Sequence, residues 1–256
     1  MNQHTTTARP GIIRVGPPRA PRVRLLCVPY AGAGTAAYRA FPAVLPPTVE
    51  VWAVRLPARE TRLTEEPLTD IGAVVTALVD ELATEPFAAD VPFALFGHSM
   101  GALVCFELAR ALRRTGMPEP AHLFVSGRRA PRIRDELPSI HRLEPARFLD
   151  AVEQLGGIPG QVLAEPGLLD LIAPALRADF AVCETYRHTE EPPLRYGISA
   201  FGGRSDPTTT AEQLATWSTE TADRFTLRLY SGDHFFMHTH HRLILTELCR
   251  DLEIEP

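Results

Sequence analysis

Three residues that are far apart in the chain have the side chains of a nucleophile, an acid and a base. Ser99 lies in GHSMG, Asp206 in GGRSDP and His234 in YSGDHFF. A serine hydroxyl attacks a carbonyl when a histidine takes its proton and a carboxylate orients that histidine. These residue types therefore predict acyl transfer through a covalent serine intermediate.

The residues around Ser99 fit a sharp turn between a strand and a helix. GHSMG matches G-x-S-x-G, the nucleophile elbow, in which a strained serine needs small neighbours. Gly97 and Gly101 provide that room. The structural alternative is an ordinary glycine-flanked turn, but an apolar run before the pattern and an amphipathic segment after it favour the elbow.

Short apolar runs alternate with helical patterns, which is typical of a mostly parallel sheet flanked by helices on both faces. Strands are predicted over 23–28, 49–54, 92–97, 121–127, 197–203 and 225–231, and helices over 69–85, 101–116 and 241–253. Asp206 and His234 follow the last two strands, so both should lie at the carboxyl edge of the sheet beside Ser99. The order Ser, Asp, His is that of the α/β-hydrolases, which is the predicted fold class.

Residues from about 135 to 192 interrupt this alternation with helical pieces and no convincing strand. A helical insertion between two core strands predicts a lid over one end of the sheet. The domain prediction is a flexible leader over 1–21 and a single domain over 22–256 that contains this lid. Apolar residues of the insertion that could surround an acyl chain, or could simply pack it onto the core, are Leu155, Leu168, Leu171, Ile172, Leu176 and Phe180.

A developing oxyanion needs two backbone donors. One should be the N–H of Met100, which follows the serine at the start of a helix. The stretch CVPYAGAGTAAY follows an early strand with small residues, and it predicts the N–H of Ala31 as the second donor.

Other acids fit the triad less well. Asp233 adjoins His234 and is poorly placed to accept a hydrogen bond from its ring. Asp179 lies in the predicted lid, where we do not expect a fixed position. Asp206 is therefore the predicted acid.

The composition excludes several other chemistries. All 26 basic residues are arginine, so there is no lysine for a Schiff base or for a lysine-containing phosphate loop. The net charge of -5 gives no reason to expect nucleic acid or an anionic membrane as partner. Four widely spaced cysteines fit a reducing cytoplasm, and no apolar stretch predicts a signal peptide or a membrane span. The histidines of HTHH at 238–241 have no clear carboxylate or thiolate partner in the sequence, so no metal is predicted. The serine mechanism needs no organic cofactor, and none is predicted.

Six stretches together carry a family resemblance: VPYAGAG, VRLPARETRL, FALFGHSMGAL, FVSGRRAP, APALRADFAVCETY and YSGDHFFM. They resemble the free-standing type II thioesterases that serve polyketide and nonribosomal peptide synthetases. The resemblance implies hydrolysis of acyl groups from the phosphopantetheine arm of acyl or peptidyl carrier proteins, which removes stalled or aberrant units. It places the family's nucleophile, acid and base on Ser99, Asp206 and His234.

Two positions depart from the family pattern. AGAG has Ala33 where a glycine is expected, and LPARE has Ala58 where LPGRE is expected. An alanine held at positive φ would cost about 1 kcal/mol.

The arginines that could attract an acidic carrier protein, or form an ordinary basic loop, are Arg128, Arg129, Arg132 and Arg134.

Three alternatives share this sequence pattern. An esterase acting on small free esters would use the same residues. A non-catalytic binding protein of the hydrolase fold would be expected to lack a member of the triad, yet all three are present. A chain-releasing domain of a synthetase is disfavoured by the starting methionine and the short leader.

Overall fold

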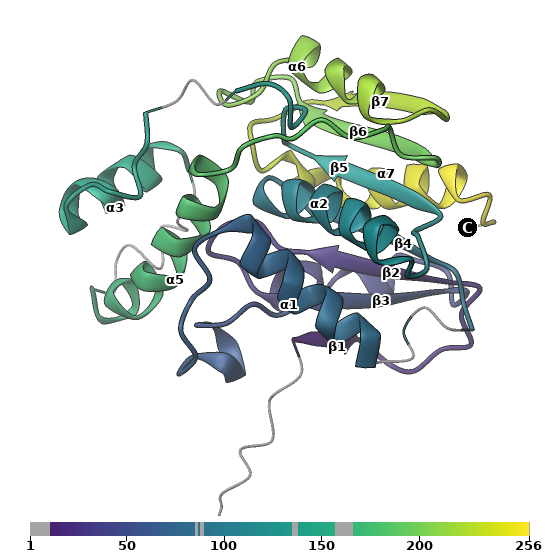
Figure 1. The fold of residues 1–256 in the computed structure, drawn as a ribbon, viewed down its shortest axis with the longest axis horizontal. Coiled ribbons are helices and arrows are strands. Elements are labelled where there is room, and N and C mark those ends of the chain that lie inside the picture. Colours follow the sequence, from purple (N-terminus) through teal and green to yellow (C-terminus); the bar gives the residue numbers. More distant parts are fainter. Residues whose placement is uncertain (1–10, 85–86, 88–89, 135–137, 157–165, 256) are drawn as a thin grey trace, which may run out of the picture.

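A seven-stranded sheet forms the centre of the molecule in a computed structural model, which describes residues 11–84, 87, 90–134, 138–156 and 166–255 (Figure 1). The strand order is β1-β3-β2-β4-β5-β6-β7, and every pairing is parallel except that of β1 with β3. The strands are β1 (Ile12–Val15), β2 (Val23–Val28), β3 (Val49–Val54), β4 (Phe93–His98), β5 (His122–Ser126), β6 (Gly197–Gly203) and β7 (Phe225–Tyr230). The six predicted strands are confirmed, each within one residue at either end.

The central strands are apolar throughout because both of their faces are covered. Leu26 and Leu95 point into the core under α1 (Ile71–Thr84) and α2 (Met100–Thr115), whereas Leu25 and Phe96 point into the core under α7 (Phe236–Asp251). Side chains that alternate between two cores require a layer of helices on each side of the sheet.

The three predicted helices are present, but the last of them, α7, begins at Phe236, five residues earlier than predicted. Oδ1 of Asp70 accepts a hydrogen bond of 2.9 Å from the amide of Ala73 at the start of α1, and Gly116 ends α2 with φ 68°. No helix in the described ranges is both long and apolar enough to cross a membrane. The helices are α1 (Ile71–Thr84), α2 (Met100–Thr115), α3 (Pro145–Gln154), α5 (Pro166–Glu184), α6 (Ala211–Ala215) and α7 (Phe236–Asp251).

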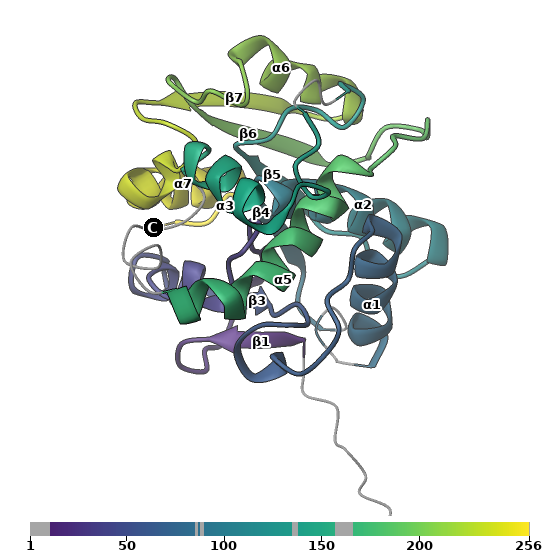
Figure 2. The same ribbon diagram turned by 90° about the vertical axis from the view of Figure 1, so that its left-hand side faces the viewer.

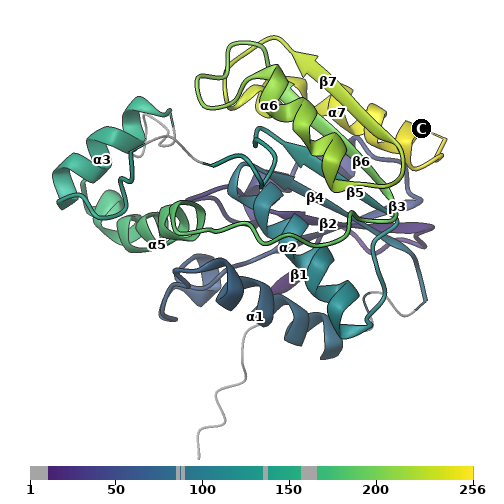
Figure 3. The same ribbon diagram turned by 45° about the horizontal axis from the view of Figure 1, so that its top comes forward.

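The chain between β5 and β6 contributes α3 and α5. Both helices stand at one end of the sheet, and α5 also packs against α2, where Val182 joins the core (Figures 2 and 3). The described residues within 138–192 contain no strand, in line with the predicted helical character. Residues 135–137 and 157–165 of the predicted insertion lie outside the described ranges.

The prediction of a flexible leader over 1–21 is wrong for its second half. Residues 12–15 form β1, an antiparallel edge strand beside β3. The Arg19 side chain donates hydrogen bonds to the carbonyls of Pro46 and Val49, at 2.8 and 3.0 Å. The four residues of β1, IIRV, are too few to show the alternation of apolar and polar side chains that predicts a strand. The strand is recognised only by its pairing with β3. Residues 1–10 lie outside the described ranges.

A buried histidine in β5 makes the stability of this fold depend on pH. Nε2 of His122 lies 2.8 Å from Oγ of Ser199. Burial, assisted by Arg224 and opposed by Asp251, lowers the pKa of His122 from 6.5 to about 4. The unfolded chain binds this proton below pH 6.5, whereas the folded chain does not bind it until about pH 4.

We therefore predict that the free energy of unfolding is highest above pH 6.5 and loses about 3 kcal/mol through this group as the pH falls towards 4. Urea unfolding at several pH values between 7.5 and 4.5 measures the loss. The His122→Gln variant should show a shallower dependence, because its side chain cannot take up a proton. An identical dependence in both proteins would contradict the prediction.

Candidate active site

Ser99 occupies the turn between β4 and α2. Its backbone angles, φ 52° and ψ -115°, lie outside the regions that residues other than glycine usually adopt. The Ser99 amide donates a hydrogen bond of 2.8 Å to the carbonyl of Ser126, so the neighbouring strand β5 holds the turn. Backbone strain of this kind clusters at functional sites.

The strand and the helix cross at Gly97 and Gly101. A Cβ on Gly97 would lie 2.1 Å from the carbonyl oxygen of Gly101, and a Cβ on Gly101 would lie 2.0 Å from that of Val28. Both contacts are with backbone, which cannot turn aside as a flexible side chain can. The prediction that these positions need glycine for space is confirmed.

The loops after β6 and β7 bring an acid and a base together. Nδ1 of His234 lies 2.8 Å from Oδ2 of Asp206, whose side chain is fully buried. Burial raises the pKa of Asp206, but hydrogen bonds from His234 and Thr208 outweigh it and hold the pKa below its usual value. The carboxylate is therefore charged at neutral pH and orients the ring of His234.

Thr208 is a third member of this cluster that the sequence analysis missed. Its amide and its hydroxyl donate to Oδ1 of Asp206 at 2.8 and 2.7 Å. The hydroxyl oxygen also lies 3.1 Å from Nδ1 of His234. An aspartate side chain in a turn often accepts from the residue two positions on, and that spacing is the signal that could have identified Thr208.

His98, which precedes the serine, lies against His234. The two ring centroids are 5.0 Å apart, and Nδ1 of His98 lies 2.9 Å from Oγ of Ser126. Burial, and then the nearby histidines, lower the pKa of His98 well below its usual value. This ring is therefore a neutral packing surface beneath the base.

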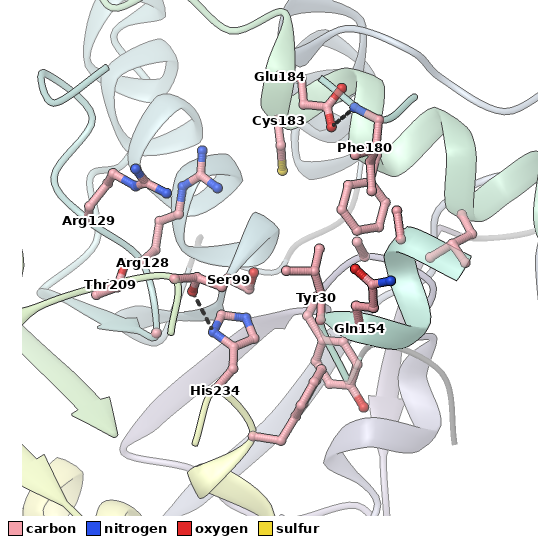
Figure 4. A pocket seen from close by; sticks show the side chains of 18 of the residues that line it. Tyr30, Ser99, Arg128, Arg129, Gln154, Phe180, Cys183, Glu184, Thr209 and His234 are labelled. Carbon is pink, nitrogen blue, oxygen red and sulfur yellow. Dashed lines mark hydrogen bonds between the residues drawn. The ribbon is translucent and has the colours of Figure 1, made fainter. Parts of the chain in front are cut away.

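A cavity of about 350 Å³ is lined by both Ser99 and His234 (Figure 4). Tyr30 and Ala31 contribute from the loop after β2, and α3 and α5 contribute the opposite wall. Apolar side chains in the lining from these helices and the preceding loop include Ile140, Ala151, Leu155, Leu176 and Phe180. The cavity therefore joins the reactive side chains to a space that suits an apolar group.

Three of the six residues predicted to surround an acyl chain line this cavity, namely Leu155, Leu176 and Phe180. The prediction is wrong for Leu168 and Leu171, which are 40% and 49% exposed, and Ile172 is not among the lining residues. Leu168 lies two helical turns before Leu176, roughly 12 Å along the axis, and this distance takes it past the cavity.

Of the two predicted oxyanion donors, Ala31 lines the cavity, and Met100 directly follows Ser99, which also lines it. The Met100 amide is the first of α2 and has no acceptor within its own helix. Ala31 lines the cavity, and the next residue, Gly32, has the positive φ of this loop, 77°. Ala33 is not among the described residues with positive φ, whereas Ala58 has φ 61°. Of the two departures from the family pattern, only Ala58 therefore carries strain.

Asp179 is fixed in place, contrary to the prediction. Its carboxylate is 2% exposed and forms two hydrogen bonds of 2.8 Å with the guanidinium of Arg59. Oδ2 also accepts a hydrogen bond of 2.7 Å from the amide of Gly32. The sequence could not reveal this contact, because its members are separated by 120 and 147 residues.

The remaining histidines of the C-terminal segment make separate local contacts. Nε2 of His238 lies 3.3 Å from the hydroxyl of Tyr30, and Nε2 of His240 lies 2.9 Å from the carbonyl of Ser231. Within the described part of the chain, no group of three or more histidine, cysteine, aspartate or glutamate residues is arranged to hold a metal ion.

Two of the four arginines considered for partner binding, Arg128 and Arg129, line the cavity (Figure 4). Arg132 donates a hydrogen bond of 2.7 Å to the carboxylate of Glu220, and Arg134 is exposed. Arg128 and Arg129 are therefore the two of the four that lie beside the reactive residues.

Comparisons with known proteins agree with this geometry. A family model described as a thioesterase domain matches residues 23–254. The gramicidin S biosynthesis protein GrsT of Aneurinibacillus migulanus is 38% identical over 235 residues, which cover 92% of this chain and 91% of that protein. The structure of RedJ, a thioesterase from the prodiginine pathway in Streptomyces coelicolor, gives a TM-score of 0.84 at 36% identity and covers 91% of this chain and 86% of that chain. The structure of the type II thioesterase BorB from the borrelidin biosynthetic cluster gives a TM-score of 0.86 at 34% identity. The match covers 98% of this chain and 100% of that chain.

The crossing of β4 and α2 predicts a severe effect of one added methyl group. The Gly101→Ala variant should lose about 3 kcal/mol of stability, because its Cβ would overlap a backbone carbonyl. Thermal unfolding measures the loss. Gly167→Ala in α5 is the matched control, since no described atom lies within 4 Å of its added Cβ, and its unfolding temperature should stay the same or rise slightly. Equal unfolding temperatures for the two variants would argue against the steric explanation.

Proposed function

Since this chain belongs to the thioesterase family, we propose that it hydrolyses acyl groups from the phosphopantetheine arm of acyl or peptidyl carrier proteins, and so clears aberrant or stalled units from a synthetase. The chain has the α/β-hydrolase fold of the thioesterases that it resembles in structure. Ser99 and His234 line one cavity with apolar walls, and this juxtaposition carries the proposal.

In the proposed reaction Ser99 is the nucleophile. His234, held by Asp206, takes the proton of the hydroxyl as its oxygen attacks the thioester carbonyl. The amides of Met100 and Ala31 stabilise the oxyanion. The pantetheine thiol leaves with a proton from His234, and a water molecule then hydrolyses the acyl-serine by the same route. The net reaction converts a thioester and water into a carboxylic acid and a thiol.

We assign the acyl group to the part of the cavity bordered by α3 and α5, and these helices to a lid. Leu155, Leu176 and Phe180 support this assignment, since they form an apolar wall opposite the residues that react. A cavity of about 350 Å³ is at the small end of the range usual for small-molecule sites. The acyl groups that fit should therefore be short or medium in length.

Two features support a carrier protein of a biosynthetic synthetase as the partner. GrsT takes part in gramicidin S biosynthesis, and BorB is a type II thioesterase from a biosynthetic cluster. Arg128 lines the cavity and is partly exposed, so it is placed to meet negative charge on the carrier or on its prosthetic arm, whereas Arg129 is buried. The same proposal places the reaction in the cytoplasm.

The role of Ser99 predicts that Ser99→Ala abolishes the release of acyl groups. Removal of the nucleophile should lower kcat by at least about a thousandfold. A panel of carrier proteins loaded with acyl chains of increasing length, assayed for free thiol, measures the loss and the chain-length preference together. Full activity of the variant would overturn the assignment. Matched free esters hydrolysed faster than the carrier-bound thioesters would favour the alternative, an esterase for small substrates.

The contacts of Thr208 predict a positioning effect. Thr208→Val removes a hydrogen bond to a charged carboxylate but keeps the shape of the side chain, so kcat should fall about tenfold with KM nearly unchanged. Thr208→Ser keeps the hydroxyl and should restore most of the rate. If valine and serine gave the same kcat, the hydroxyl would have no part in orienting His234.

A further inference from the structure

The carboxylate of Asp179 connects α5 to the loop that carries the predicted oxyanion donor Ala31. We propose that Asp179 is a positioning residue, which fixes that loop so that the Ala31 amide faces the reacting carbonyl. This role rests on the proposed function, because it gives the Ala31 amide a task in the reaction. It extends the site from the residues that react to a helix of the insertion.

The hydrogen bond from Gly32 to Asp179 holds the peptide unit directly after Ala31. Gly32 has φ 77°, a conformation that glycine adopts readily, along with many others, because it has no Cβ. Its amide donates to Oδ2 of Asp179 at 2.7 Å, and a bond to a charged acceptor is among the stronger hydrogen bonds in proteins. Without that acceptor, this part of the loop could turn and carry the Ala31 amide out of line.

Arg59 holds the same loop from its other side. Nη1 of Arg59 donates to the carbonyl of Ala33 at 2.9 Å and to Oδ2 of Asp179 at 2.8 Å. The next residue, Glu60, accepts from the amide of Thr35 at 2.7 Å. The loop is therefore anchored at Gly32, Ala33 and Thr35, immediately after the proposed donor.

α5 also packs directly on this loop. A Cβ added to Gly32 would lie 2.7 Å from Cδ1 of Leu176, a residue that lines the cavity. Asp179 and Leu176 are three residues apart on α5, so one face of the helix contacts the loop with both an apolar and a charged side chain. The wall of the acyl cavity and the oxyanion loop are therefore in direct contact through α5.

A test must separate the hydrogen bond from the ion pair, because a buried Arg59 without its partner would destabilise the fold. The double variant Arg59→Met/Asp179→Asn removes the ion pair but keeps an oxygen that can accept from Gly32. The double variant Arg59→Met/Asp179→Leu removes both. Thermal unfolding and circular dichroism confirm that each variant is folded, and Arg59→Met/Asp179→Ala replaces the leucine variant if that protein does not fold.

Both double variants lose the bond from Arg59 to the Ala33 carbonyl, so they are compared with each other. We expect kcat of the leucine variant to be about a hundredfold lower than that of the asparagine variant. Loss of one oxyanion donor typically costs that much. KM for a carrier-bound thioester should change by less than about threefold in both. Equal kcat in the two double variants, or a change confined to KM, would overturn the positioning role. A Ser99→Ala protein assayed alongside tests the proposed function separately. Full activity of this protein would refute the proposed function. Its inactivity would leave the difference between the two double variants to be explained by the positioning role.

Discussion

The close crossing of β4 and α2 is the constraint on which the rest of the site depends. Gly97, Gly101 and the carbonyl of Val28 approach so closely that no side chain fits between them. Ser99 must then adopt a strained turn, and its amide bonds to β5 while α2 begins at the next residue. The strain is tolerated because a parallel sheet fixes the strands on both sides of β4.

Parallel strands also explain why an acid and a base so far along the chain reach the serine. β5, β6 and β7 follow β4 in the sheet and end at the same edge. The loops beyond β6 and β7 then need only local contacts to pair Asp206 with His234. Thr208 donates a hydrogen bond to the second oxygen of the Asp206 carboxylate. The buried negative charge therefore has a hydrogen-bond partner on each of its oxygens.

The sequence predicts those parts of the fold that depend on local pattern. Three strands, 23–28, 49–54 and 197–203, have the predicted bounds because their apolar runs are continuous and end at turn residues. β1 is missed because four residues gain their order only by pairing with β3. The prediction that Asp179 has no fixed position is wrong for a related reason. Arg59 and Gly32 hold it in place, and these residues are too distant in the sequence for a local pattern to connect them to Asp179. The apolar residues of the insertion also could not show where the cavity ends along α5, so the prediction included the exposed Leu168.

The strain at Ala58 belongs to the same network. Ala58 and Glu60 have φ 61° and 53°, while Arg59 between them is extended. A left-handed residue other than glycine costs about 1 kcal/mol or more, so two of them in three residues need compensation. Arg59 provides it through both oxygens of Asp179, and Glu60 provides it through the amide and hydroxyl of Thr35. The strained loop thus aims two successive charged side chains at the segment that carries Ala31, and an alanine is tolerated at position 58 because these bonds hold the backbone there.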